Sequence, residues 1–183
     1  MTAEIIQFNK KTVESVRISL PYNLIAINAA KKLKGEFDKA TKDWVFNWQD
    51  ANQAYWLEDI FNSSPTEIGI RINRVSKLPW VFRTPTFNCA ISLFGVPVVL
   101  FNKQTKAPYL SYEANMNSDC EIVYENGRVA VRNGTEFYFL VPWKILKLVE
   151  DGAFDDYALL QHGTIHSELK RHEFEFILDK MTV

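Results

Sequence analysis

The sequence is poor in cysteine, in long hydrophobic runs and in net charge. It contains two cysteines, Cys89 and Cys120, and its first residues lack a secretory leader, so we expect reduced thiols in a cytoplasmic protein. No apolar run approaches the roughly 18 residues of a membrane span, so no membrane partner is expected. The balance of 21 basic and 22 acidic residues argues against bulk attraction to nucleic acid or membrane.

Signatures of catalysis are also missing. The chain has no G-x-x-x-x-G-K-[ST] loop, so it is not an ATP-driven motor of that kind, and it has no G-x-S-x-G turn. Neither cysteine has a histidine nearby in sequence that would single it out as a nucleophile. We expect no cofactor, and we favour a protein that is not an enzyme.

The 183 residues suit one medium domain or two small ones, and a hydrophobic content of 47% with 14% aromatics is ample for a core. The predicted fold class is α+β. We expect a small strand–helix–hairpin–helix module at 12–62, followed by a mostly antiparallel β domain with one or two helices at 66–183. The sequence Asn62-Ser63-Ser64-Pro65 breaks the pattern between them. We find no internal repeats and no low-complexity tract.

Two helices are predicted in the first module. One spans 24–34 with Asn23 as N-cap and Gly35 at C′, and the other begins at Asp50 with Gln53 completing a capping-box-like pair and ends at Phe61. The expected apolar stripes are Leu24, Ile27 and Ala30 or Lys31 on the first helix and Ala54, Leu57 and Phe61 on the second.

Between these helices lies a predicted hairpin, F-D-K-A-T-K-D-W-V-F, from Phe37 to Phe46. With the strand 16–20 before it, the arrangement resembles the HARP (HepA-related) module that lies next to the motor of annealing helicases. The residues that carry the resemblance are Pro21, Tyr22, Gly35, Phe37, Asp38, Thr41, Lys42, Trp44 and Phe46. The resemblance implies contact with branched or single-stranded DNA. Period two places Trp44, Phe46 and Trp48 on one strand face, where at least two should pack on the helices.

The second domain alternates with period two. Ile68, Ile70 and Ile72 should share one face, and Gly95 and Pro97 should mark a bend or bulge. The pairs Asn126-Gly127 and Asn133-Gly134 predict two tight turns in a three-stranded meander over 121–141. A helix should then run from Pro142 to Val149 and close at Gly152, followed by a helical patch at 155–161 and a strand at 172–178.

Charge is unevenly placed along the second domain. The segment 68–112 holds six cations and no acid, whereas 150–183 holds eight acids and three bases. Cations interleaved with aromatics suit single-stranded nucleic acid, because the cations track phosphates and exposed rings stack on bases. Alternatively, the aromatics form the β core and the two segments pair with each other. The candidate nucleic-acid residues here are Arg71, Arg74, Lys77, Trp80, Arg83, Lys103 and Lys106.

Lysines also cluster in the first module, at the end of the first helix and in the hairpin. Phosphate contact is one interpretation, and a solvated face with lysines near a helix C-terminus is the other. The candidates for phosphate contact are Lys31, Lys34, Lys39 and Lys42.

Two weaker constellations concern metals. His162, His166 and His172 could hold a metal, but no H-E-x-x-H pattern supports them. Asp155 or Asp156 with Glu168 and Lys170 fits the loose spacing of an Mg²⁺ nuclease, although the residues before Glu168 lack the apolar strand of such a site. A solvated acidic surface is the alternative.

We favour a non-catalytic DNA-binding accessory protein. The resemblance implies contact with forked or single-stranded DNA and, for such a module on a stand-alone chain, a phage or plasmid origin. The main alternative is an inhibitor or adaptor that binds a host nucleic-acid-processing or defence complex, in the manner of an anti-CRISPR protein. An Mg²⁺-dependent nuclease is the third hypothesis. The sequence leaves the oligomeric state open.

Overall fold

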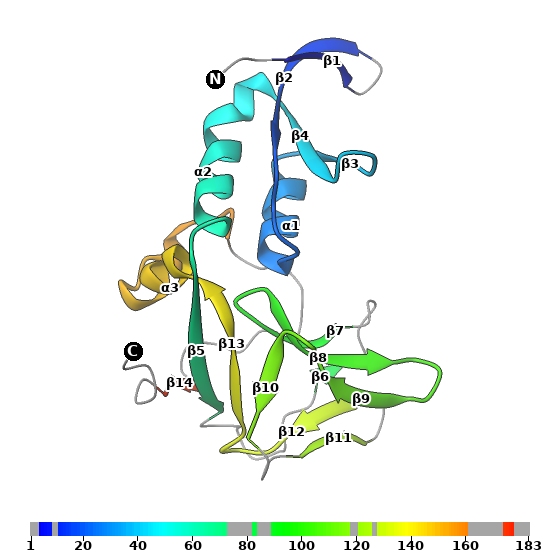
Figure 1. The fold of residues 1–183 in the computed structure, drawn as a ribbon, viewed down its shortest axis with the longest axis vertical. Coiled ribbons are helices and arrows are strands. Elements are labelled where there is room, and N and C mark those ends of the chain that lie inside the picture. Colours follow the sequence, from blue (N-terminus) through cyan, green and yellow to red (C-terminus); the bar gives the residue numbers. More distant parts are fainter. Residues whose placement is uncertain are drawn as a thin grey trace. The chain divides into compact units, whose positions relative to one another are not determined.

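The computed structural model describes residues 4–8, 11–72, 82–83, 89–117, 121–125, 128–160 and 174–177. These residues form helices and mostly antiparallel open sheets, so the expected α+β class is confirmed (Figure 1). The chain divides into two compact units. Unit 1 comprises Met1–Ser64 with Pro142–His162, and unit 2 comprises Pro65–Val141 with Gly163–Val183. The expected second domain, 66–183, is therefore interrupted by a segment that belongs to unit 1.

Unit 1 is a sheet of order β1-β2-β4-β3 with helices packed on it. Helix α2 contacts α1 and also β2 and β4. The register pairs Val16 with Phe46 and Ile18 with Trp44, and all four side chains are buried on one face of the sheet. The elements are β1 (Glu4–Phe8), β2 (Lys11–Ile18), α1 (Leu24–Lys32), β3 (Glu36–Asp38), β4 (Asp43–Asn47), η1 (Trp48–Asp50), α2 (Ala51–Phe61), α3 (Trp143–Glu150) and η2 (Phe154–Asp156).

Helix α1 begins as predicted but buries a different face. The side-chain oxygen of Asn23 accepts hydrogen bonds from the N–H groups of Ile25 (2.9 Å) and Ala26 (3.2 Å). Of the predicted stripe, Ala30 is buried as expected, whereas Leu24 and Ile27 are only half-buried. The buried residues are Ile25, Ala26, Ala29 and Ala30.

The end of α1 corrects the role of Gly35. Lys34, not Gly35, takes the left-handed C′ position, with a φ of 59°. The N–H of Lys34 donates to the carbonyl of Lys31, and that of Gly35 to the carbonyl of Ala30, both at 2.9 Å. This is the double hydrogen bond of a Schellman end. Glycine is needed at 35 for another reason, because a Cβ there would lie 2.5 Å from the buried ring of Phe46.

Helix α2 keeps its predicted stripe but not its predicted cap. Ala54, Leu57 and Phe61 are buried, as expected. The side chain of Asp50 makes no capping hydrogen bond, because the turn η1 already brings the chain into a helical path. The side chain of Asn47 supplies the cap instead, accepting from the N–H of Gln49 at 3.0 Å.

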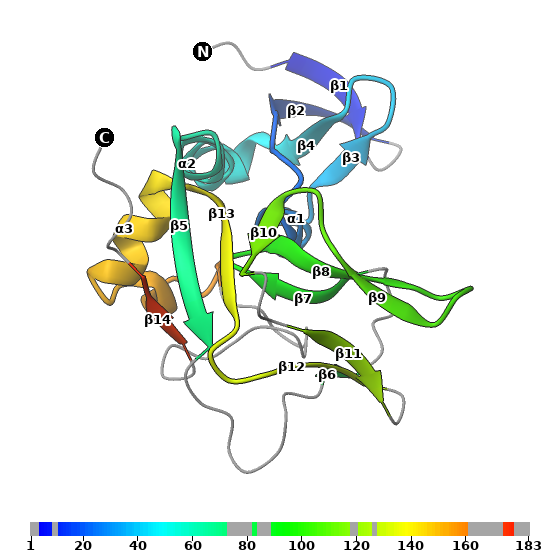
Figure 2. The same cartoon turned by 60° about the horizontal axis from the view of Figure 1, so that its bottom comes forward.

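Unit 2 contains three sheets, with strand orders β10-β13-β5-β14, β11-β12-β6 and β7-β8-β9 (Figures 1 and 2). Ile68, Ile70 and Ile72 are buried, as their alternation predicted. The strands are β5 (Pro65–Ile72), β6 (Phe82–Arg83), β7 (Cys89–Leu93), β8 (Val96–Asn102), β9 (Ala107–Leu110), β10 (Ala114–Met116), β11 (Ile122–Glu125), β12 (Arg128–Val131), β13 (Glu136–Pro142) and β14 (Phe174–Phe176).

Two predicted turns of unit 2 need correction. Phe94 and Gly95 both have positive φ (50° and 76°) between β7 and β8, so Gly95 completes a two-residue hairpin turn rather than a bend. The predicted three-stranded meander is wrong, because β12 and β13 belong to different sheets. Gly134 and Thr135 instead exchange backbone hydrogen bonds with Ile72 (2.7 and 2.9 Å), which carries the chain to β5. Strands β11 and β12 do pair, with Glu125 opposite Arg128, while the predicted turn residues Asn126 and Gly127 lie outside the described residues.

The segment after β13 returns to unit 1. Helix α3 begins at Trp143, one residue later than predicted, so Pro142 is the N-cap residue and not the first residue of the helix. Gly152, with a φ of 70°, follows its C-cap as expected. The helical patch predicted at 155–161 is a single 3-10 turn, η2, and the predicted strand at 172–178 contains β14. The ring of Tyr157 lies 5.0 Å from that of Trp56 on α2.

Candidate nucleic-acid interface

The β3–β4 hairpin presents two of the predicted lysines in a four-residue loop. Asp38 pairs with Asp43 across the hairpin, so the loop is Lys39 to Lys42, and both lysines are exposed. A carboxylate oxygen of Asp38 accepts from the N–H of Ala40 (2.9 Å), and its carbonyl accepts from the N–H of Lys42 (2.8 Å). Lys42 closes the turn with a φ of 65°. These backbone contacts hold both lysine side chains at the surface.

Arg17 of β2 reaches across the sheet to fix this loop. One of its nitrogens lies 2.9 Å from a carboxylate oxygen of Asp38 and 3.3 Å from the hydroxyl of Thr41. The hydrogen bond from Arg17, followed by that from the N–H of Ala40, lowers the pKa of Asp38 below its ordinary value. The negative charge beside the two lysines is therefore paired within the sheet.

Phe37 is the exposed ring of the hairpin. It lies on the edge strand β3 with 49% of its surface exposed, and its ring centroid is 5.5 Å from that of Trp44 at a tilt of 56°. Trp44 is only 6% exposed. The Trp44 ring thus supports Phe37 from the core side while the rest of the Phe37 ring faces solvent.

The residues that carry the family resemblance mostly build the hairpin itself. Trp44 and Phe46 are buried, as expected, whereas Trp48 lies in η1 and is 38% exposed. Asp38 and Thr41 are bonded to Arg17. The exposed side chains of the module include those of Tyr22, Lys31, Lys34, Phe37, Lys39 and Lys42.

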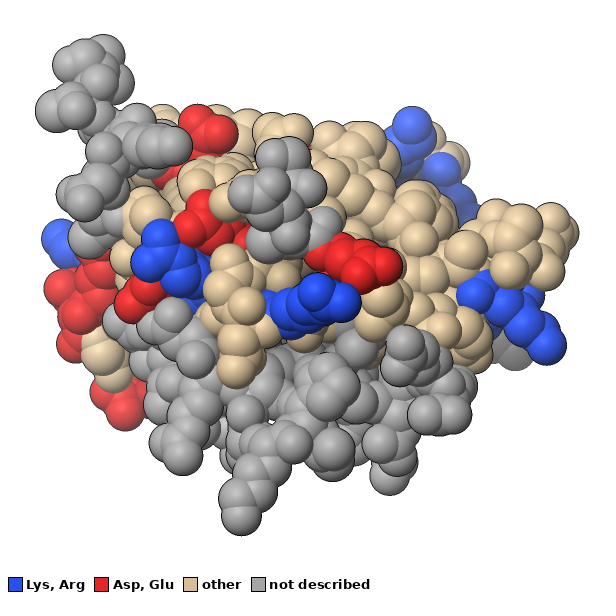
Figure 3. Space-filling model, turned by 90° about the horizontal axis from the view of Figure 1, so that it is seen from below, with Lys and Arg blue, Asp and Glu red and all other residues tan. Residues whose placement is uncertain are grey.

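In unit 2, Arg71 is engaged in ion pairs. Its guanidinium lies 2.7 Å from Glu136 and 2.8 Å from Glu175. The hydroxyl of Tyr138, and then Arg71, lower the pKa of Glu136 by hydrogen bonding, and the two carboxylates raise the pKa of Arg71. Glu175 comes from the acidic end of the chain. This ion pair therefore agrees with the alternative interpretation, in which the basic and acidic segments pair with each other. Figure 3 shows Lys and Arg in separate groups, with acidic side chains beside several of them.

Lys103 and Lys106 are exposed in a second hairpin loop that has the same length as the first. Asn102 pairs with Ala107, so residues 103–106 form the loop. The side-chain oxygen of Asn102 accepts from the N–H groups of Gln104 (2.9 Å) and Thr105 (3.2 Å). Lys106 closes the turn with a φ of 51°, as Lys42 does in unit 1. Tyr109 on β9 is 46% exposed.

The two loops share a sequence pattern that the sequence analysis missed. Phe37-Asp38-Lys39-Ala40-Thr41-Lys42 and Phe101-Asn102-Lys103-Gln104-Thr105-Lys106 both fit F-[DN]-K-x-T-K. A search for short repeats would have found it. The importance of Arg17 and of Phe37 was also missed, and only the pairing of β4 with β2 on one side and with β3 on the other makes it visible.

Several predicted residues lie outside the described part of the chain. Arg83 is on β6, but its side chain is not described. Among the described residues no group of histidine, cysteine and acidic side chains could hold a metal ion. The predicted residues outside the description are Arg74, Lys77, Trp80, Cys120, His162, His166, Glu168, Lys170 and His172.

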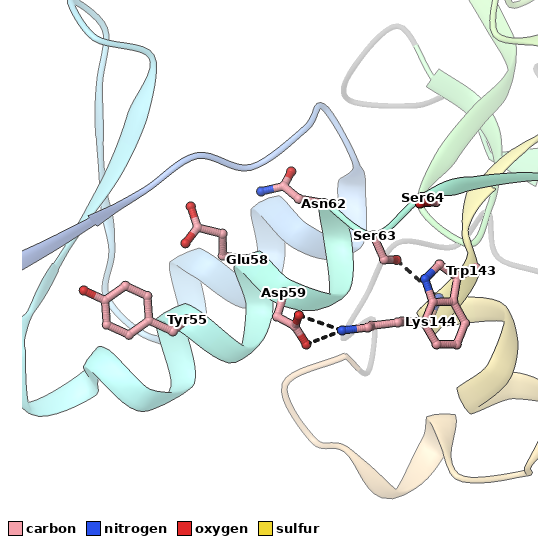
Figure 4. Close-up of a pocket in the computed structure, with 8 residues that line it drawn as sticks. All are labelled: Tyr55, Glu58, Asp59, Asn62, Ser63, Ser64, Trp143 and Lys144. Atoms are coloured by element: carbon pink, nitrogen blue, oxygen red, sulfur yellow. Dashed lines mark hydrogen bonds and ion pairs between the residues drawn. The ribbon is translucent and has the colours of Figure 1, made fainter. Parts of the chain in front are cut away.

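A polar groove of about 480 Å³ runs between α2 and α3 within unit 1 (Figure 4). The side-chain Nζ of Lys144 lies 2.6 Å from the carboxylate of Asp59 across the groove. The backbone N–H of Lys144 donates to the hydroxyl of Ser63 at 3.3 Å. These contacts dock α3 onto α2. The groove lining contains no histidine and no cysteine.

Comparison with protein-family models, curated proteins and solved structures finds no significant match for this chain. None of the helices in the described ranges combines the length and apolar character that a membrane crossing requires.

Proposed function

We propose that this chain is a non-catalytic accessory protein that binds single-stranded or forked DNA through unit 1. The observation that carries the proposal is the β3–β4 hairpin, where exposed lysines flank an exposed ring. Gly35 and the three-residue strand β3, which is about 10 Å long, lie between Lys34 and Lys39 in the chain. Lysines at such spacing can follow a phosphate backbone, and a ring between them can reach a base.

The resemblance to the HARP module supports the same proposal, since it implies contact with branched or single-stranded DNA. The motor that lies next to the HARP module in annealing helicases needs a nucleotide-binding loop, and this sequence has no G-x-x-x-x-G-K-[ST] pattern. We therefore propose that the protein recognises DNA without remodelling it. A phage or plasmid origin and action in the cytoplasm complete the proposal.

Unit 1 is favoured over unit 2 as the contact surface. In unit 2 the guanidinium of Arg71 already binds two carboxylates, and the phenylalanine beside Lys103 is buried, with 3% exposure at Phe101. In unit 1 the equivalent ring is exposed and the neighbouring carboxylate of Asp38 is paired with Arg17. Both differences leave unit 1 with the better combination of cation and ring.

The test is fluorescence anisotropy of single-stranded, forked and duplex DNA over a salt series. Lys39→Glu with Lys42→Glu should weaken binding by roughly tenfold or more, and should reduce the salt slope by up to about two if both lysines contact phosphates. The matched control is Lys103→Glu with Lys106→Glu, which makes the same change in the same kind of loop and should alter affinity by less than about threefold.

Equal losses from both double variants would show that the contact is not specific to unit 1. Absence of wild-type binding at low salt would reject DNA as the ligand. It would favour the protein-binding inhibitor or adaptor, for which Trp143 on α3, 41% exposed, offers an aromatic contact.

A further inference from the structure

We propose that Phe37 stacks on an unpaired base and thereby determines a preference for single-stranded over duplex DNA. This inference rests on the proposed function and assigns its strand selectivity to one side chain. Each of the two F-[DN]-K-x-T-K segments begins with a phenylalanine. The ring of Phe37 is 49% exposed, whereas that of Phe101 is 3% exposed.

The surroundings of Phe37 suit a stacking platform. Trp44 contacts it at 5.5 Å between ring centroids and is itself buried, so the Phe37 ring is supported on the core side. A supported ring loses little rotamer freedom when a base arrives, which favours binding. Phe37 is also on β3, which among the described strands lies at the edge of its sheet with β4 as its neighbour.

The charges around the ring are arranged for a nucleic-acid chain. Lys34 and Lys39 lie on either side of β3, and Lys42 lies in the same loop, all exposed. Three carboxylates lie near them. Asp38 is paired with Arg17 at 2.9 Å, Glu36 is exposed at the start of β3, and Asp43 follows Lys42 in a half-buried position. The three lysines outnumber Glu36 and Asp43, so the local field favours phosphate.

The ring discriminates because of where bases lie in DNA. Bases of a duplex are stacked on their neighbours and offer a protein their edges and the phosphates, whereas unpaired bases expose their faces. Lysine contacts should therefore hold both forms, and Phe37 should add affinity for the unpaired form alone.

The decisive variant is Phe37→Leu, which keeps an apolar side chain and removes the aromatic face. Affinity for single-stranded DNA should fall by roughly 5- to 150-fold, the range expected for one base–ring stack. Affinity for duplex should change by less than about twofold, and the salt slope should stay the same because no charge is altered. Phe37→Trp should restore single-strand binding. Tyr109→Leu, which removes a ring of similar exposure in unit 2, should have no such effect.

A second readout follows stacking directly. A single-stranded oligonucleotide carrying 2-aminopurine should lose fluorescence on binding the wild-type protein, because stacking quenches this base, and should keep it on binding Phe37→Leu. Unchanged melting temperatures would show that both variants fold. Equal losses for single strand and duplex, or no loss, would overturn the stacking role while leaving DNA binding intact. Failure of the wild-type protein to bind any DNA would instead reject the proposed function and this inference with it.

Discussion

Phe37 and Phe101 occupy the same place in two hairpins with the same sequence pattern, yet one ring is 49% exposed and the other 3%. The loops themselves match. Each has four residues, each is tied by the side-chain oxygen of an Asp or Asn, and each ends in a lysine with positive φ. The six residues therefore specify the turn, and something beyond them decides whether the ring is buried.

The position of each strand in its sheet accounts for the difference. Strand β3 is an edge of the unit 1 sheet, whereas β8 lies between β7 and β9 in unit 2. The ring of Phe101 also contacts Tyr124 of β11 at 4.7 Å. A ring on a central strand under a second sheet becomes core, and the same ring on an edge strand remains available to a ligand.

The largest effect should come from breaking the packing behind the first hairpin. In Gly35→Ala the new Cβ would lie 2.5 Å from the ring of Phe46, which is completely buried. We expect a loss of about 2–3 kcal/mol in the free energy of unfolding, because a packed core cannot move aside. Urea unfolding followed by circular dichroism measures it.

Gly134→Ala in unit 2 is the matched control. No atom lies within 4 Å of the added Cβ, but Gly134 has a φ of 85°, so only backbone strain of about 1 kcal/mol is expected. In the double variant Gly35→Ala with Phe46→Leu, the loss in the free energy of unfolding should be smaller than the sum of the two single losses, because the ring that the new Cβ meets has been removed. Full additivity would show that the contact with Phe46 is not the reason for glycine at 35.

The sequence predicted those features of the fold that depend on neighbours in the chain. The Asn23 cap, the stripe of α2 and the burial of Trp44 and Phe46 follow from local chemistry and periodicity, and all are confirmed. The sequence could not show that Asn133-Gly134 leads into a different sheet, because backbone hydrogen bonds of Gly134 and Thr135 to the distant Ile72 redirect the chain. The return of Pro142–His162 to unit 1 is likewise a long-range contact.

The candidate site was predictable in part for the same reason. The exposed lysines of the first hairpin were expected from their positions in a turn. The pairing of Arg71 with Glu175 joins residues 104 positions apart. The uneven distribution of charge along the chain suggested that basic and acidic segments pair, but it could not identify the two partners. The exposure of Phe37 depends on strand order, which no six-residue pattern contains.

A smaller effect concerns how stability depends on pH, because the first loop contains the ionisable Asp38 where the second contains Asn102. Asp38→Asn gives the first loop the amide chemistry of Asn102, so the turn should survive, but the ion pair with Arg17 is lost. Because the pKa of Asp38 is lowered in the folded state, its stabilising contribution is present above the unfolded pKa and disappears as the pH falls through the folded value. The wild-type protein should therefore lose more stability than Asp38→Asn below about pH 4.

The control for this prediction is a double-mutant cycle. In the background of Arg17→Met, Asp38→Asn should have a smaller effect on the urea midpoint at pH 7 than it has in the wild-type protein. An equal effect in both backgrounds would mean that Asp38 acts on the turn alone, as Asn102 does in unit 2.

The smallest effect tests whether the two turns are equivalent. Lys42 and Lys106 hold left-handed conformations, with φ of 65° and 51°, that glycine adopts without strain. Glycine also raises the entropy of the unfolded chain, so Lys42→Gly and Lys106→Gly should each change the free energy of unfolding by no more than about 1 kcal/mol, and by similar amounts. Thermal unfolding of the two variants compares them directly. A clear loss at Lys42 alone would mean that its side chain supports the fold of unit 1. Similar small changes, with weaker DNA binding only for Lys42→Gly, would show that the same turn holds a lysine for the ligand in one unit and simply closes a hairpin in the other.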